Sequence, residues 1–200
     1  MTEELSRLAP VSAIELNLSC PNITHSLKGM SNKFKLTAQD KDATVKVIKR
    51  VRKLTKLPII AKLSPNVTDI KEIAKAAEGA GADAISAINT LFGLRVDIKT
   101  RKPLLARGTG GLSGPAIKPV ALNFVKEIYS AVKIPIIGMG GIMAWEDAVE
   151  FIITGATAVG VGTASFVNPS AGEEIVQGIK TYMEKNNLND IMSLIGTLRS

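Results

Sequence analysis

The stretch Lys56-Leu57-Pro58-Ile59-Ile60, written KLPII, recurs as KIPII at residues 133–137 of this chain of 200 residues. A second pair follows the same order, since GADAI at 81–85 recurs as GATAV at 155–159. Each copy leads into a short run of β-branched or small apolar residues, as buried strands do. The chain therefore repeats a unit that enters a strand.

Short apolar runs alternate with longer amphipathic segments, and this rhythm predicts a parallel α/β fold. The strand candidates are residues 13–18, 59–63, 84–88, 136–139 and 158–161. The helix candidates are residues 39–54, 69–78, 116–132, 145–153 and 173–185, with a further one near 190–195. Repeated βα units favour a (β/α) barrel over a doubly wound sheet, because no glycine fingerprint follows the first strand.

The count of units makes this barrel partial. Five βα units can be identified, whereas a closed TIM barrel has eight strands and typically about 250 residues. We expect residues 1–200 to form a single domain, and residues 1–10 to be the middle of a helix that leads into the first strand. An open parallel sheet leaves two unpaired edges, so either the chain is a fragment of a longer protein, or another chain supplies the missing part, or the product is inactive. We expect a fragment, because of this interpretation of residues 1–10.

Composition narrows the function classes. Apolar residues make up 46% of the chain, and the formal net charge is +7. The basic residues of 46–56 follow helical spacing between apolar ones, which is typical of a solvated helix face. Few aromatic residues and no nucleic-acid motif argue against nucleic acid as a partner. No apolar run approaches the roughly 20 residues that span a bilayer, and no signal peptide is evident, so we expect a cytoplasmic protein.

The long excursion from residue 90 to residue 115 has no clean helix. Its segments 95–98 and 103–105 flank KTRK at 99–102, which predicts a small hairpin over the mouth of the barrel. Long ordered loops in compact domains are usually functional.

The reactive groups of such barrels gather at the carboxyl ends of the strands. Residues in these positions are Asn17, Cys20, Asn22, Lys62, Ser64, Asn89 and Thr90, followed by the glycine-rich stretches 138–141 and 160–163. Glycine-rich turns after the last strands either bind phosphate through backbone N–H groups or serve only as tight turns. A third glycine-rich segment at 110–114 favours phosphate. Asparagine and threonine side chains at neighbouring strand ends suit a planar polar ligand.

Lys62 lies in a run that is otherwise apolar, and two interpretations remain open. The lysine either faces the barrel mouth and serves an anionic ligand, or it pairs with a core carboxylate such as Glu15.

Cys20, the single cysteine, is either a small buried hydrophobe or a group that exchanges a proton. It lies beyond its strand in a polar loop, and an ordinary thiol has a pKa of about 8.5, which favours the second interpretation. His25, the single histidine, is interpreted as incidental. With one cysteine and one histidine we expect no metal site.

Six ordered motifs carry a resemblance over nearly the whole chain. They are ELNLSCPN at 15–22, AKLSPNVTDI at 61–70, AINT at 87–90, GGLSGPAIKPVAL at 110–122, GMGGI at 138–142 and VGVGTA at 159–164. In this order and spacing the sequence resembles the class 1 dihydroorotate dehydrogenases, most closely class 1B.

The resemblance implies an FMN-containing (β/α) barrel that oxidises dihydroorotate to orotate in de novo pyrimidine (UMP) biosynthesis. Cys20 matches the base that takes the proton from C5 while hydride passes from C6 to the flavin. Asn17 matches a residue that contacts flavin and substrate, and Asn22, Asn89 and Thr90 match substrate-binding positions. The flavin-binding positions implied are Lys62, Ile88, Gly114, Gly140, Gly141, Gly162 and Thr163.

The resemblance also implies partners, and the sequence departs from the family pattern in two places. Class 1B members work with an iron-sulfur, FAD-bearing subunit that passes electrons to NAD, and we expect a homo-oligomer. The loop at 23–40 is longer than the family's short glycine-rich lid, and the family's first three βα units are missing, so the chain matches strands 4 to 8. The alternatives are a barrel like that of dihydropyrimidine dehydrogenase, which acts on uracil and thymine, and a non-catalytic FMN-binding fragment.

Overall fold

The computed structural model describes residues 1–19 and 37–199. Within them the five predicted strands form one parallel sheet in the order β1-β2-β3-β8-β9. The strands are β1 (Ile14–Asn17), β2 (Ile59–Lys62), β3 (Ala84–Ala87), β8 (Ile136–Met139) and β9 (Ala158–Gly160). Spatial order follows chain order, as it does in a (β/α) barrel. The α/β prediction and the partial-barrel arrangement are therefore confirmed.

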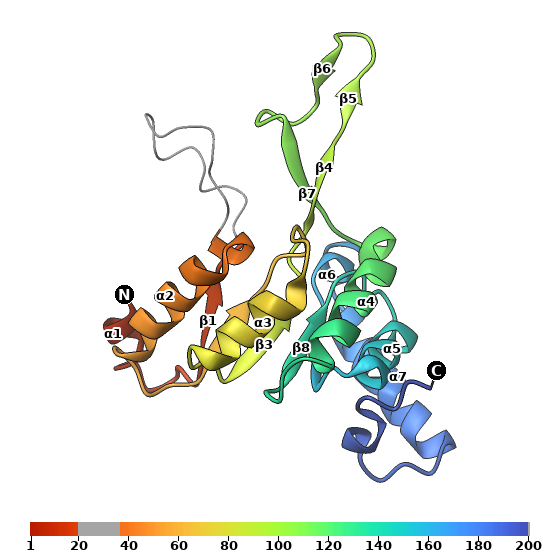
Figure 1. Cartoon of the computed structure of the whole chain (residues 1–200). Coiled ribbons are helices and arrows are strands. Elements are labelled where there is room, and N and C mark those ends of the chain that lie inside the picture. Colours follow the sequence, from red (N-terminus) through yellow and green to blue (C-terminus); the bar gives the residue numbers. More distant parts are fainter. Residues whose placement is uncertain (20–36, 200) are drawn as a thin grey trace.

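Helices cover one face of this sheet (Figure 1). They are α2 (Lys41–Arg52), α3 (Ile70–Gly79), α4 (Lys118–Tyr129), α5 (Trp145–Thr154) and α7 (Ala171–Lys185). The burial of β2 alternates accordingly, because Ile59 and Ala61 are fully buried whereas Ile60 and Lys62 are partly exposed. The core lies between the sheet and the helices, and the opposite face of the sheet carries Glu15, Asn17 and Lys62.

Several helix boundaries differ from the sequence prediction, and at three of them the structure has a separate 3-10 turn. Asp40 caps α2 by accepting a hydrogen bond from the Ala43 N–H at 2.9 Å, so the helix begins at Lys41 and a separate 3-10 turn, η2 (Thr37–Gln39), precedes it. Residues 116–132 divide into the turn η3 (Pro115–Ile117) and α4. The segment near 190–195 is only a 3-10 turn, η4 (Ile191–Leu194), because Gly196 follows with a φ of 69° and ends it.

Two short helices were not predicted as such. The helix α1 (Thr2–Leu5) is a single turn, shorter than the helix expected over residues 1–10. The helix α6 (Thr163–Val167) directly follows β9. No helix within the described residues is long and apolar enough to cross a membrane.

The excursion after β3 is a two-part antiparallel hairpin. β4 (Leu91–Leu94) pairs with β7 (Thr109–Leu112), and β5 (Val96–Asp97) pairs with β6 (Lys102–Pro103). The predicted hairpin is thus confirmed, but its expected position over the barrel mouth is wrong. The β4–β7 ladder carries the tip away from the sheet (Figure 1), and Ile98 near the tip is 87% exposed.

Candidate functional site

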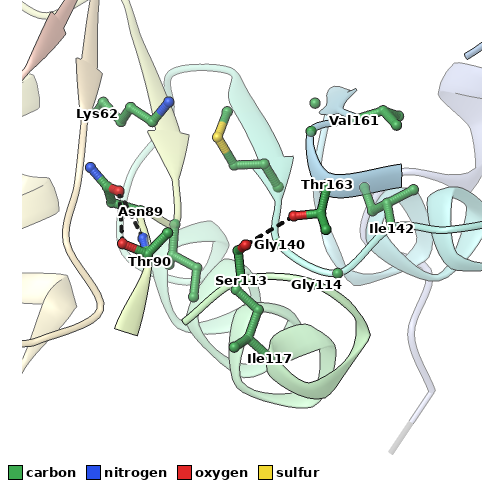
Figure 2. A pocket seen from close by; sticks show the side chains of 15 residues that line it. Lys62, Asn89, Thr90, Ser113, Gly114, Ile117, Gly140, Ile142, Val161 and Thr163 are labelled. Carbon is green, nitrogen blue, oxygen red and sulfur yellow. Dashed lines mark hydrogen bonds between the residues drawn. The ribbon is translucent and has the colours of Figure 1, made fainter. Parts of the chain in front are cut away.

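A pocket of about 320 Å³ lies at the carboxyl ends of the parallel strands (Figure 2). Every predicted flavin-binding residue except Asn17 lines it, and so do the predicted substrate-binding residues Asn89 and Thr90. The other lining residues were not named individually from the sequence. Ser113, Met139, Gly160 and Val161 lie in the glycine-rich stretches that the sequence marked, whereas Ile117 and Ile142 were missed. The strand ends therefore bring together residues from five separate parts of the chain.

One wall of the pocket is made of glycine backbone. Gly114, Gly140 and Gly141 have φ angles of 90°, 129° and 81°, which other residues rarely adopt. A Cβ on Gly141 would lie 2.7 Å from the Gly114 carbonyl oxygen and 2.9 Å from the Lys118 nitrogen. Two loops thus approach each other as closely as backbone allows, and glycine is required there for packing as well as for conformation.

Two hydroxyl groups lie beside this glycine wall. Thr163 Oγ1 donates a hydrogen bond to Ser113 Oγ at 3.0 Å (Figure 2). A Cβ on Gly162 would meet nothing within 4 Å, so open space adjoins that backbone. Open backbone with adjacent hydroxyl donors is the chemistry that binds a phosphate group. The pocket therefore fits a phosphate-bearing ligand.

An amide cluster joins the ends of β1 and β3. Asn89 Nδ2 donates to Asn17 Oδ1 at 3.2 Å and to Ser19 Oγ at 2.6 Å. Asn89 Oδ1 accepts from the Thr90 N–H at 2.7 Å. Asn17 is therefore held against the pocket residue Asn89 although it does not line the pocket itself.

Lys62 lines the pocket and also pairs with Glu15, which is partly exposed rather than a core carboxylate. Its side chain lines the pocket, and its Nζ lies 3.3 Å from Glu15 Oε1. The side chain is 22% exposed, so the ammonium group remains available to a ligand. Pairing with Glu15 and a place in the pocket lining are therefore compatible, which the sequence alone did not show.

Asn66 joins the site to the hairpin and was not predicted to matter. Its Nδ2 donates to the Thr90 carbonyl at 3.0 Å, and its Oδ1 accepts from the Phe92 N–H at 3.1 Å. Asn66 is itself held by Gln39, whose Nε2 donates a hydrogen bond to the Asn66 backbone carbonyl at 2.7 Å. The side-chain amide thus pairs with backbone on both sides of residue 91 and fixes the place where the pocket ends and the hairpin begins.

A partly buried ion pair lies beside the glycine wall. Lys118 Nζ lies 2.6 Å from Asp147 Oδ1, whose side chain is 15% exposed. Burial opposes ionisation of Asp147, but hydrogen bonds from Lys118 and from the backbone N–H groups of Met143 and Ala144 outweigh it and lower the pKa of this carboxyl. Hydrogen bonds to Asp147 and Glu150 raise the pKa of Lys118. The pair ties the start of α4 to the start of α5.

We expect Asp147→Asn to lower the free energy of unfolding by about 1–3 kcal/mol at neutral pH, because it leaves Lys118 without its closest charge partner. A lowered pKa in the folded state means that the Asp147 contribution is present above about pH 4 and is lost as the pH falls through the folded value. The difference between wild type and variant should therefore shrink in acid. Urea unfolding of the complete natural chain at neutral and acidic pH measures both effects.

Asp69→Asn is the matched control for this variant. Asp69 also caps a helix, accepting from Lys71 N–H at 2.8 Å, but no lysine side chain pairs with it in the hydrogen bonds and ion pairs of the described residues. Asparagine caps about as well as aspartate, so this change should be nearly neutral. Equal losses for the two variants would show that the lysine pair contributes nothing.

Two predicted site residues lie outside the described residues. They are Cys20 and Asn22. His25, which was interpreted as incidental, also lies outside the described residues. Within residues 1–19 and 37–199, no group of three histidine, cysteine, aspartate or glutamate side chains is arranged to hold a metal ion.

Parallel βα units with a glycine-walled pocket at their carboxyl ends define a ligand site of the (β/α)-barrel type. A family model described as dihydroorotate dehydrogenase matches residues 1–183. The chain belongs to this family.

Within this family, the chain is similar to proteins named dihydroorotate dehydrogenase B (NAD(+)), catalytic subunit. The protein of Desulforamulus reducens is 54% identical over 186 residues, covering 93% of this chain and 59% of the relative. Those of Alkaliphilus oremlandii and Geotalea uraniireducens are 52% and 50% identical over 198 residues, covering 99% of this chain and 63% of each relative. The similarity is thus to B-type members, and the chain spans about three fifths of their length.

Proposed function

We propose that this chain supplies the FMN site and part of the substrate site of a dihydroorotate dehydrogenase, which oxidises dihydroorotate to orotate in de novo pyrimidine (UMP) biosynthesis. The observation that carries the proposal is the pocket at the strand ends, which gathers residues from five of the six family motifs. The names of the relatives favour dihydroorotate over the uracil and thymine of the alternative barrel.

The pocket residues fit FMN at two ends. Gly114, Gly140, Gly141 and Gly162 line the pocket, with open space beside the Gly162 backbone. The Ser113 and Thr163 hydroxyls offer donors, so these residues would hold the phosphate. Lys62, Ile88 and Asn17 would hold the flavin ring, with Lys62 placing a positive charge beside it. When bound, FMN would supply an acceptor for the hydride that leaves C6 of dihydroorotate.

The polar residues would hold the substrate and move its proton. Asn17, Asn22, Asn89 and Thr90 carry amide and hydroxyl groups that match the edge of a planar polar ring. The contacts within the amide cluster fix the orientation of Asn89 before substrate arrives. Cys20 would remove the proton at C5, acting as the general base.

The assembly is also part of the proposal. We propose that residues 1–200 are a single domain that forms the C-terminal portion of an FMN-binding (β/α) barrel. The words "catalytic subunit" in the names of the relatives support a separate electron-transfer subunit, for which we propose an iron-sulfur, FAD-bearing protein that uses NAD. A homo-oligomer and a cytoplasmic location remain predictions from the sequence.

The test uses the complete natural chain that contains residues 1–200. We expect FMN to copurify or to bind on addition, dihydroorotate to be oxidised to orotate, and uracil to remain unreduced with NADPH. Uracil reduction with no turnover of dihydroorotate would instead support the dihydropyrimidine dehydrogenase alternative. Failure to bind FMN would contradict the proposal outright.

A further inference from the structure

Glu15 lies outside the pocket but contacts its lysine. Its Oε1 is 3.3 Å from Lys62 Nζ, and its Oε2 accepts a hydrogen bond from Ser86 Oγ at 2.8 Å. Ser86 is fully buried, whereas the Glu15 side chain is 37% exposed. A buried hydroxyl thus holds one oxygen of the carboxylate while the other oxygen faces the lysine.

The strand register explains how these three side chains meet. Lys62 pairs with Ser86 across β2 and β3, and Glu15 pairs with Ile60 across β1 and β2. Partners in register lie on the same face of a parallel sheet, as do residues two apart along a strand. All three side chains therefore lie on the sheet face opposite the helices. Glu15 is level with Ile60, two residues further from the carboxyl ends of the strands than Lys62.

The contact matters more for geometry and charge than for stability. A partly exposed Lys–Glu pair contributes little to folding, but a lysine side chain is a flexible stem with a point charge at its end. Within the described residues, Glu15 is the carboxylate that forms an ion pair with Lys62. Its negative charge therefore limits both where the ammonium group sits and how much positive potential it presents to the pocket.

We propose that Glu15 is a positioning residue that acts through Lys62, holding its ammonium group at the pocket and partly offsetting its charge. This inference rests on the proposed function, since it assumes that the pocket holds FMN. Two opposite effects on the bound flavin follow. Removing the Lys62 charge makes addition of electrons to the flavin less favourable, and removing the Glu15 charge makes it more favourable.

The experiment measures the midpoint potential of bound FMN in the complete natural chain with Lys62→Met, Glu15→Gln and Ser86→Ala. We expect a lower potential in Lys62→Met, with about tenfold weaker FMN binding from the lost charged contact. We expect a higher potential in Glu15→Gln. We expect a smaller rise in Ser86→Ala, because a carboxylate that loses its contact with Ser86 is held less closely beside Lys62 and offsets less of its charge. A merely structural role would not move the potential in opposite directions.

Glu72→Gln is the matched control, because it breaks a Lys–Glu pair with the exposed Lys41 at 2.9 Å on the outer helices. We expect it to leave the potential unchanged. An unchanged potential in Glu15→Gln, or a fall like that of Lys62→Met, would overturn the inference while leaving the proposed function intact. If Glu15→Gln does not fold, an unchanged or lower potential in Ser86→Ala overturns it equally. A wild-type chain that binds no FMN overturns both.

Discussion

Gly141→Ala is expected to weaken FMN binding by about a hundredfold. The added Cβ would meet the Gly114 carbonyl oxygen at 2.7 Å and the backbone nitrogen of Lys118 at 2.9 Å, and neither backbone atom yields easily. The φ of 81° adds further strain for any residue with a side chain. A combined cost of about 3 kcal/mol corresponds to the hundredfold loss, which equilibrium titration with FMN measures.

Gly172→Ala provides the control for this variant. Gly172 lies in the first turn of α7, and a Cβ there would meet nothing within 4 Å. Alanine favours the helix by up to about 1 kcal/mol over glycine, so FMN binding should be unaffected and stability unchanged or improved. Normal FMN affinity in Gly141→Ala would show that the two loops do not form the phosphate site.

Cys20→Ala is expected to slow orotate formation by about 10²–10⁴-fold, which is the usual contribution of a general base. Cys20→Ser should be nearly as slow, because a hydroxyl gives up its proton far less readily than a thiol. Both variants should keep their FMN, since the glycine wall and Lys62 are untouched. Steady-state orotate formation, with FMN content measured on the same samples, checks the two expectations together.

His25→Asn tests the competing base. Because His25 is interpreted as incidental, its loss should leave orotate formation within about twofold of wild type. If Cys20→Ala retains the wild-type rate, Cys20 is not the base. A slow His25→Asn beside a fast Cys20→Ala would move that role to the histidine.

The sheet was predictable because its strands are short apolar runs introduced by repeated sequences. Burial on the helix side imposes Val, Ile, Leu and Ala on such strands. This apolar pattern can be recognised in the sequence without knowing which strands pair. Much of the pocket followed from one rule, that the carboxyl ends of parallel strands meet at one edge. Lys62, Asn89 and Thr90 were found by their places at strand ends.

The remaining features depend on tertiary contacts that a sequence pattern does not encode. The β4–β7 ladder was missed because Gly93, Gly110 and Gly111 interrupt its alternation of apolar residues. Ser113 lies within a recognised motif, yet its role depends on meeting the hydroxyl of Thr163, fifty residues later. The Asn66 side chain reaches the backbone of Thr90 and Phe92, more than twenty residues later, as well as the nearby Ser64 hydroxyl, and no residue pattern predicts these long-range contacts.

The account is tested most directly by a single turnover without oxygen. Dihydroorotate is mixed with the FMN-loaded complete natural chain, and the visible absorbance of the flavin is followed together with orotate. We predict that the absorbance falls and that one orotate forms for each FMN, at a rate that Cys20→Ala slows by about 10²–10⁴-fold. An unchanged flavin absorbance with no orotate formed would contradict the central claim that this pocket binds FMN for the oxidation of dihydroorotate.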